Sequence, residues 1–128
     1  MKKTISLALA AAILLAIAVV SFSGCRFEDI SLDEAKSNLE GAGYTVTVMS
    51  GEEFADSEKN TYMIMSSELN NYLYAVKGSE SIHMFFFVNV DIASNNYSFM
   101  NGPDGLLGGQ NNSVVYFATK QARKDAKL

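Results

Sequence analysis

Cysteine and histidine each occur once in this chain, as Cys25 and His83, and both side chains can take part in chemistry. A thiolate is a nucleophile and a metal ligand, and an imidazole is a general base and a metal ligand. His83 has no second His or free Cys with which to build a zinc site. No G-x-S-x-G elbow occurs, and spacing assembles no Ser-His-Asp set. We therefore expect no metal, no cofactor and no catalytic residue, with His83 structural or partly exposed.

Cys25 follows a stretch that has the composition of a secretory signal. Lys2 and Lys3 come after the first Met, and an apolar run extends from Ile5 to Phe22. Small residues then separate this run from the cysteine. A basic region, an apolar region and small residues at the cleavage point are the three parts of a signal peptide.

The residues Phe22-Ser23-Gly24-Cys25 resemble the lipobox of bacterial lipoproteins, in which the cysteine is lipidated and becomes the first mature residue. The lipobox usually has Leu where this chain has Phe22. The resemblance implies that residues 1–24 are a lipoprotein signal peptide and that 25–30 are a lipidated tether. The length of the remaining chain allows one domain, so we expect 31–128 to form a single α+β domain, whose elements are derived below. More loosely, the mature part resembles small bacterial envelope lipoproteins of uncharacterised function.

The resemblance also implies a location outside the cytoplasm, in the cell membrane or the outer membrane, with the lipid on Cys25 as the anchor. A lipoprotein cysteine carries at least two acyl chains such as palmitate, and stable anchoring takes two hydrophobic signals. Two alternatives stay open. The apolar run reaches the lower edge of the roughly 17–25 residues that span a bilayer, which would suit an uncleaved transmembrane anchor. Cleavage near Ser23 without lipidation would instead give an ordinary secreted protein.

The net charge argues against nucleic acid as a partner. Ten Lys and Arg residues against fourteen Asp and Glu give −4, and removal of Lys2 and Lys3 with the signal makes the mature chain more acidic. Nucleic-acid binding needs a basic footprint, which an acidic body lacks. The basic residues near the C-terminus are more typical of a solvated helix face than of a binding patch.

Two polar stretches suggest binding loops without carrying a recognised motif. The stretch from Gly102 to Gly109 is rich in glycine, but Gln110 stands where a phosphate loop has Lys, so we expect a flexible turn. The acidic residues of 52–58 lack the order of an EF-hand, so we expect a solvated loop.

Aromatic residues supply the remaining candidate site. Those able to form a stacking surface for a ligand are Tyr62, Tyr72, Tyr74, Tyr97, Phe85 and Phe87. Tyrosine at the boundary between a core and water is also ordinary in a small sheet domain. A concave pocket lined by these rings would favour a small-ligand or glycan binder.

The first half of the domain reads as a helix and a strand. Ser31 and Glu34 form a capping box before an apolar stripe, which predicts a helix over 32–41. The β-branched residues of 44–49 predict a strand. The polar residues 52–60 predict a loop or short exposed turn, and 61–66 fit either a strand or a buried turn.

The second half begins with a hairpin. Residues 71–76 and 81–90 are apolar, rich in β-formers and joined by a short turn that contains Gly78. The run from Met84 to Val88 predicts a central strand, because an exposed edge of this kind would aggregate. A short helix that Asp91 caps, a long loop over 101–112, a strand over 113–118 and a helix over 120–127 follow.

These elements predict an α+β domain, a two-layer sandwich in which two or three helices pack on a small antiparallel sheet, with a ferredoxin-like arrangement compatible. Our leading functional hypothesis is a non-enzymatic, lipid-anchored envelope protein that presents this domain to a protein partner. It predicts an exposed apolar patch of several hundred Å². A small-ligand or glycan binder is the alternative, followed by a secreted or membrane-anchored domain of unknown role.

Overall fold

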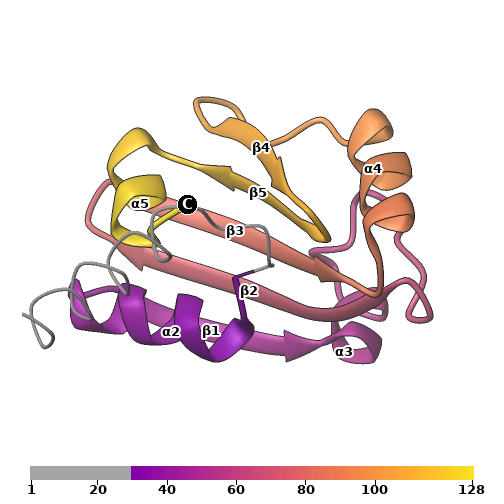
Figure 1. Ribbon diagram of the computed structural model, residues 1–128, viewed down its shortest axis with the longest axis horizontal. Helices are drawn as coiled ribbons and strands as arrows, with labels where there is room; N and C mark the ends of the chain where they lie inside the picture. The colour runs from indigo at the N-terminus through magenta and orange to yellow at the C-terminus, as the bar shows by residue number, and fades with distance from the viewer. Residues whose placement is uncertain (1–29) are drawn as a thin grey trace, which may run out of the picture.

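The computed structural model describes residues 30–128, so the predicted signal peptide and the lipidation at Cys25 lie outside the described residues. Helices and strands alternate irregularly along this part of the chain (Figure 1). In chain order they are α2 (Leu32–Gly41), β1 (Thr45–Ser50), α3 (Gly51–Ala55), β2 (Leu69–Lys77), β3 (Glu80–Phe87), α4 (Val90–Phe99), β4 (Leu107–Asn111), β5 (Val114–Ala118) and α5 (Lys120–Asp125).

The strands form one sheet in the order β1-β2-β3-β5-β4, and every pairing is antiparallel. The predicted hairpin is β2 and β3, and β3 is the central strand that the sequence indicates. Because β3 and β4 both pair antiparallel with β5, they run parallel to each other, with α4 in the connection between them. This is one split βαβ unit, whereas a ferredoxin-like domain has two; here β1, β2 and β3 are consecutive neighbours.

Both faces of the sheet are covered, which corrects the expectation of two layers. Side chains alternate along β3, with Ile82, Met84 and Phe86 in one hydrophobic cluster and Phe85 and Phe87 in another. Helices α2 and α5 pack on the first face; α3, α4 and their connections pack on the second. The continuous apolar run of β3 is the physical reason, because a strand buried on both faces needs apolar residues at successive positions.

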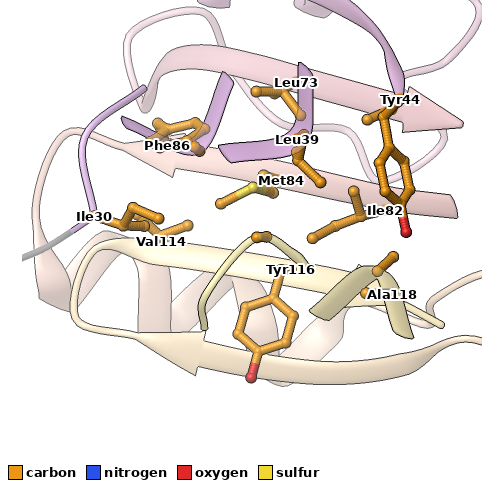
Figure 2. Close-up of a cluster of buried hydrophobic side chains, with 14 residues drawn as sticks. Ile30, Leu39, Tyr44, Leu73, Ile82, Met84, Phe86, Val114, Tyr116 and Ala118 are labelled. Atoms are coloured by element: carbon orange, nitrogen blue, oxygen red, sulfur yellow. The ribbon is translucent and has the colours of Figure 1, made fainter. Parts of the chain in front are cut away.

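The first face holds a core whose packing begins with a well-capped helix. Ser31 Oγ accepts a hydrogen bond from the Glu34 amide at 3.1 Å, so α2 starts where the capping box predicts. Figure 2 shows Leu39 of α2 among Leu73, Ile82 and Met84 of the sheet. Burial of one Leu side chain stabilises a fold by about 1.5–3 kcal/mol, so this face contributes strongly to stability.

Helix α3 occupies part of the stretch predicted to be a loop. Ser50 Oγ accepts from the Glu53 amide at 3.1 Å and donates to the Glu53 carboxylate at 3.3 Å, so Ser50 caps the N-terminus of α3. Phe54 anchors the helix in the second core. Ser50 and Glu53 follow the same S-x-x-E pattern that predicts α2, although the acidic residues around them favour a loop.

Strand β4 lies within the predicted 101–112 loop. Gly108 pairs with Phe117 and Gly109 with Tyr116 of β5. A Cβ on Gly109 would lie 2.3 Å from the Tyr116 hydroxyl oxygen, and one on Gly108 would lie 2.9 Å from the Phe117 ring. The Tyr116 and Phe117 side chains fill the space where side chains of β4 would otherwise lie. This packing explains why a segment with low intrinsic β-propensity forms a strand.

The boundary between β3 and α4 differs from the prediction. Strand β3 ends at Phe87 rather than Val90, and α4 begins at Val90, one residue before the Asp91 expected to cap it. Asn89 is the cap, and its Oδ1 accepts from the Ile92 amide at 2.8 Å. Residues 61–66 contain turns and no strand, which is the second of the two alternatives that the sequence left open.

Candidate functional site

A pocket of about 190 Å³ opens on the second face of the sheet, opposite the face that α2 and α5 cover. It lies where the α3–β2 connection and the α4–β4 connection approach β2 and β3. Its lining residues are Lys59, Thr61, Tyr62, Tyr72, His83, Phe85 and Pro103.

The floor of the pocket is aromatic and rigid. Tyr72 and Phe85 are only 2% and 1% exposed, and their ring centroids lie 5.2 Å apart. The ring of Phe54, on α3, packs against both of them, with its centroid 4.6 Å from that of Tyr72 and 5.5 Å from that of Phe85. Such offset and edge contacts add stability beyond the area that they bury. The floor is therefore held in place by the packing of its own rings.

Tyr62 forms a wall of the pocket. Its ring meets Phe85 edge to face at 5.6 Å and lies nearly parallel to Phe117 at 6.4 Å. Burial raises the pKa of the Tyr62 hydroxyl, so it is protonated near neutral pH. The wall thus offers an apolar face with one hydroxyl.

Asn60 holds the loop that carries Tyr62. Its Nδ2 donates to the Ile64 carbonyl at 2.8 Å and to the Ala55 carbonyl at 3.2 Å, while its Oδ1 accepts from the Ile64 amide at 2.9 Å. Met63, between Tyr62 and Ile64, has a φ of 61° in the left-handed region. This turn lets Tyr62 face the pocket while Ile64 is buried in the second core.

A tyrosine and the histidine form the polar end of the pocket. The Tyr72 hydroxyl oxygen lies 2.7 Å from His83 Nδ1, which leaves Nε2 as the other hydrogen-bonding atom of the ring. Burial, and then the positive charge of Lys59, lower the pKa of His83 to about 4. Burial, and then the nearby Tyr74 and Tyr62, raise the pKa of Tyr72. Both side chains are therefore neutral at pH 7.

Lys59, Tyr74 and His83 pack against one another in that order at the rim of the pocket. The Lys59 Nζ lies 4.9 Å from the centre of the Tyr74 ring, and the Tyr74 ring lies 4.7 Å from the His83 ring. Tyr74 and His83 face each other across the β2–β3 pairing. The cation–π contact holds a positive charge over this end of the pocket.

The structure brings part of the predicted tyrosine surface together. Tyr62, Tyr72 and Phe85 line the pocket, and Tyr74 backs His83. Tyr97 packs against Phe117 at 6.1 Å, outside the lining, and Phe87 is buried in the core. His83, expected to be structural or partly exposed, is intermediate in burial and contacts a pocket tyrosine.

Other sequence candidates do not join the pocket. The acidic residues of 52–58 belong to α3 and the turn after it, and no group of three or more His, Cys, Asp or Glu that could hold a metal occurs in residues 30–128. The predicted glycine-rich turn is divided between Pro103, which lines the pocket, and strand β4.

Sequence reasoning missed Lys59, Thr61, Asn60 and Pro103 as parts of the site. All of them lie in loops, where no periodicity marks which side chains turn inward. The available signal was weak: a polar loop with Tyr62 and Ile64 embedded in it must bury at least one of them.

No protein-family model, curated protein or solved structure matches this chain. Within residues 30–128, no helix has the length and hydropathy needed to cross a bilayer.

Proposed function

We propose that this protein is a lipid-anchored, extracytoplasmic domain that binds a small ligand in the pocket between Tyr62, Phe85 and His83. The pocket itself carries the proposal, because it combines a packed aromatic floor, a stacking wall and a few hydrogen-bonding groups at one end. Small-molecule sites have this composition. The lipid anchor rests on the lipobox-like residues that end at Cys25.

The proposal is for binding rather than catalysis. The groups in the pocket supply stacking, hydrogen bonds and one positive charge, and these are what recognition requires. The volume of about 190 Å³ lies below the roughly 300–1,000 Å³ of sites for drug-sized ligands, so the ligand is small.

A ligand-observed NMR screen of single-ring fragments and monosaccharides against the full chain in detergent micelles tests the proposal. We expect binders that lose affinity at least tenfold in Tyr62→Ala, which removes the wall. Phe99→Ala is the matched control, because Phe99 is also aromatic, is 80% exposed and does not line the pocket. Equal binding by wild type and Tyr62→Ala, or no binder at all, would refute a site here.

Protein docking is the second candidate, and exposed apolar side chains favour it. Met63, Met65 and Phe99 are 87%, 61% and 80% exposed. Large exposed apolar residues mark interaction surfaces when they gather into a patch. Crosslinking in the native envelope tests this candidate, with the partner lost in Met63→Ser plus Phe99→Ser; capture that is unchanged in this variant would contradict it.

A further inference from the structure

We propose that the ligand is a single planar ring that carries a carboxylate, with the ring against Tyr62 and Phe85 and the carboxylate toward Lys59 and His83. This inference rests on the proposed function of the pocket and specifies the chemical class that the pocket selects. The volume of the pocket, its aromatic surfaces and the charge at its rim each support this inference independently.

The size of the pocket limits the ligand to one ring. A cavity of about 150 Å³ inside a protein core accommodates benzene. The volume here, about 190 Å³, leaves room for such a ring and a small substituent. Fused two-ring systems and whole nucleotides exceed it.

The surfaces of the pocket favour a flat, unsaturated ring. Tyr62 and Phe85 stand at 88° to each other, so one offers its face where the other offers its edge. Because Tyr62 and Phe85 already contact each other, an aromatic ring packs beside the pair rather than between them, with an offset stack on one ring and an edge-to-face contact with the other. A puckered saturated ring has no π-system to make these contacts.

The charge at the rim favours an anion. Lys59 is the one charged residue among the described residues that line the pocket, although the chain as a whole carries −4. Thr61, Tyr62, Tyr72 and His83 add hydroxyl and imidazole groups. A carboxylate accepts up to about four hydrogen bonds, and those from charged donors are the strongest.

A bound carboxylate couples binding to the protonation of His83. The groups that face His83 are Lys59, the hydroxyl of Tyr72 and the ring of Tyr74, and none of the three is acidic. A negative charge beside the ring favours the imidazolium, so binding raises the pKa of His83 from about 4. By linkage, affinity for the carboxylate increases as the pH is lowered toward the pKa of free His83, about 4.

Three probes of similar size test the inference on the full chain in micelles: benzoate, benzamide and cyclohexanecarboxylate. His83 is the one histidine, so its imidazole NMR signals report the site without assignment. We expect benzoate to bind about fivefold to tenfold more tightly than either other probe, and to raise the pKa of His83 where benzamide does not.

Lys59→Gln should remove the preference for benzoate over benzamide, and Lys36→Gln on α2 is the matched control because it removes a lysine from the opposite face. Benzamide binding as tightly as benzoate would overturn the carboxylate, and cyclohexanecarboxylate binding as tightly would overturn the planar ring; both results leave the pocket as a binding site. Binding of none of the probes, with other fragments bound at Tyr62, would also overturn this ligand class. Failure of every fragment would instead refute the proposed function.

Discussion

At the scale of residues, His83 links the chemistry of the pocket to the stability of the fold. It lies between the Tyr72 hydroxyl, 2.7 Å away, and the ring of Tyr74, and it stays neutral because burial and Lys59 oppose protonation. A histidine of this kind has a lower pKa in the folded state than the value of about 6.5 in the unfolded chain.

The first prediction concerns this difference in pKa. Between about pH 6.5 and the folded pKa of about 4, the unfolded state binds more protons at His83, so the free energy of unfolding falls as the pH falls through this range. In His83→Gln this contribution disappears. Chemical denaturation of both proteins at several pH values measures it, and identical pH slopes would contradict a buried neutral histidine.

The second prediction concerns Met63, whose φ of 61° is unfavourable for a residue other than Gly. Its side chain is 87% exposed, so a substitution there tests the backbone strain with little change in packing. Met63→Gly relieves the strain and should change the free energy of unfolding by less than about 1 kcal/mol, in the stabilising direction, because the entropy of Gly offsets part of the gain. Met63→Val should destabilise by about 1–2 kcal/mol, since a β-branched residue is an outlier there. Equal stability of the Gly and Val variants in urea would rule out this strain.

At the scale of elements, helix α3 depends on a close approach to β2. Gly51 begins α3, and a Cβ there would lie 1.7 Å from the Leu69 carbonyl oxygen. The backbone must move to accommodate any side chain. This contact positions the loop that follows α3 and contributes Lys59 and Tyr62 to the pocket.

The third prediction compares two glycines. Gly51→Ala should destabilise the protein by about 3 kcal/mol or more, because the obstructing atom belongs to the backbone. Gly41→Ala, at the end of α2, meets nothing within 4 Å and should stabilise by about 0.5 kcal/mol through helix propensity. Thermal unfolding separates the two variants, and a Gly51→Ala protein as stable as wild type would contradict the packing of α3 on β2.

The elements that carry strong local signals were predictable from the sequence. Helix α2 begins at its capping box, and the hairpin of β2 and β3 follows from two apolar runs around Gly78. Strand β4 was not predictable, because Gly108 and Gly109 suit a loop until Tyr116 and Phe117 lie across them. The aromatic floor was partly predictable from alternation, whereas Lys59 and Pro103 enter the pocket through loops that have no period.

At the scale of the whole molecule, the two faces of the sheet are covered in different ways. One face is sealed by α2 and α5, where the Tyr44 hydroxyl donates to Asp125 at 2.7 Å and ties α5 to the chain before β1. The other face is covered mainly by short elements and loops, and the pocket lies there.

The fourth prediction concerns attachment to a membrane. Cys25→Ala removes the thiol that the lipobox-like residues present, so fatty-acid labelling of the protein should be abolished and processing of the signal peptide blocked. Metabolic labelling with a tagged fatty acid measures this directly in the native envelope. Labelling that persists in Cys25→Ala would contradict lipidation at this residue.

Intermolecular NOEs between a bound single-ring fragment and the full chain test the central claim most directly. Ligand binding between the loops and β3 predicts NOEs from the fragment to Tyr62, Phe85 and His83, all lost in Tyr62→Ala. NOEs only to exposed residues such as Phe99 and Met65 would contradict the claim, and would move the site to the surface of the protein.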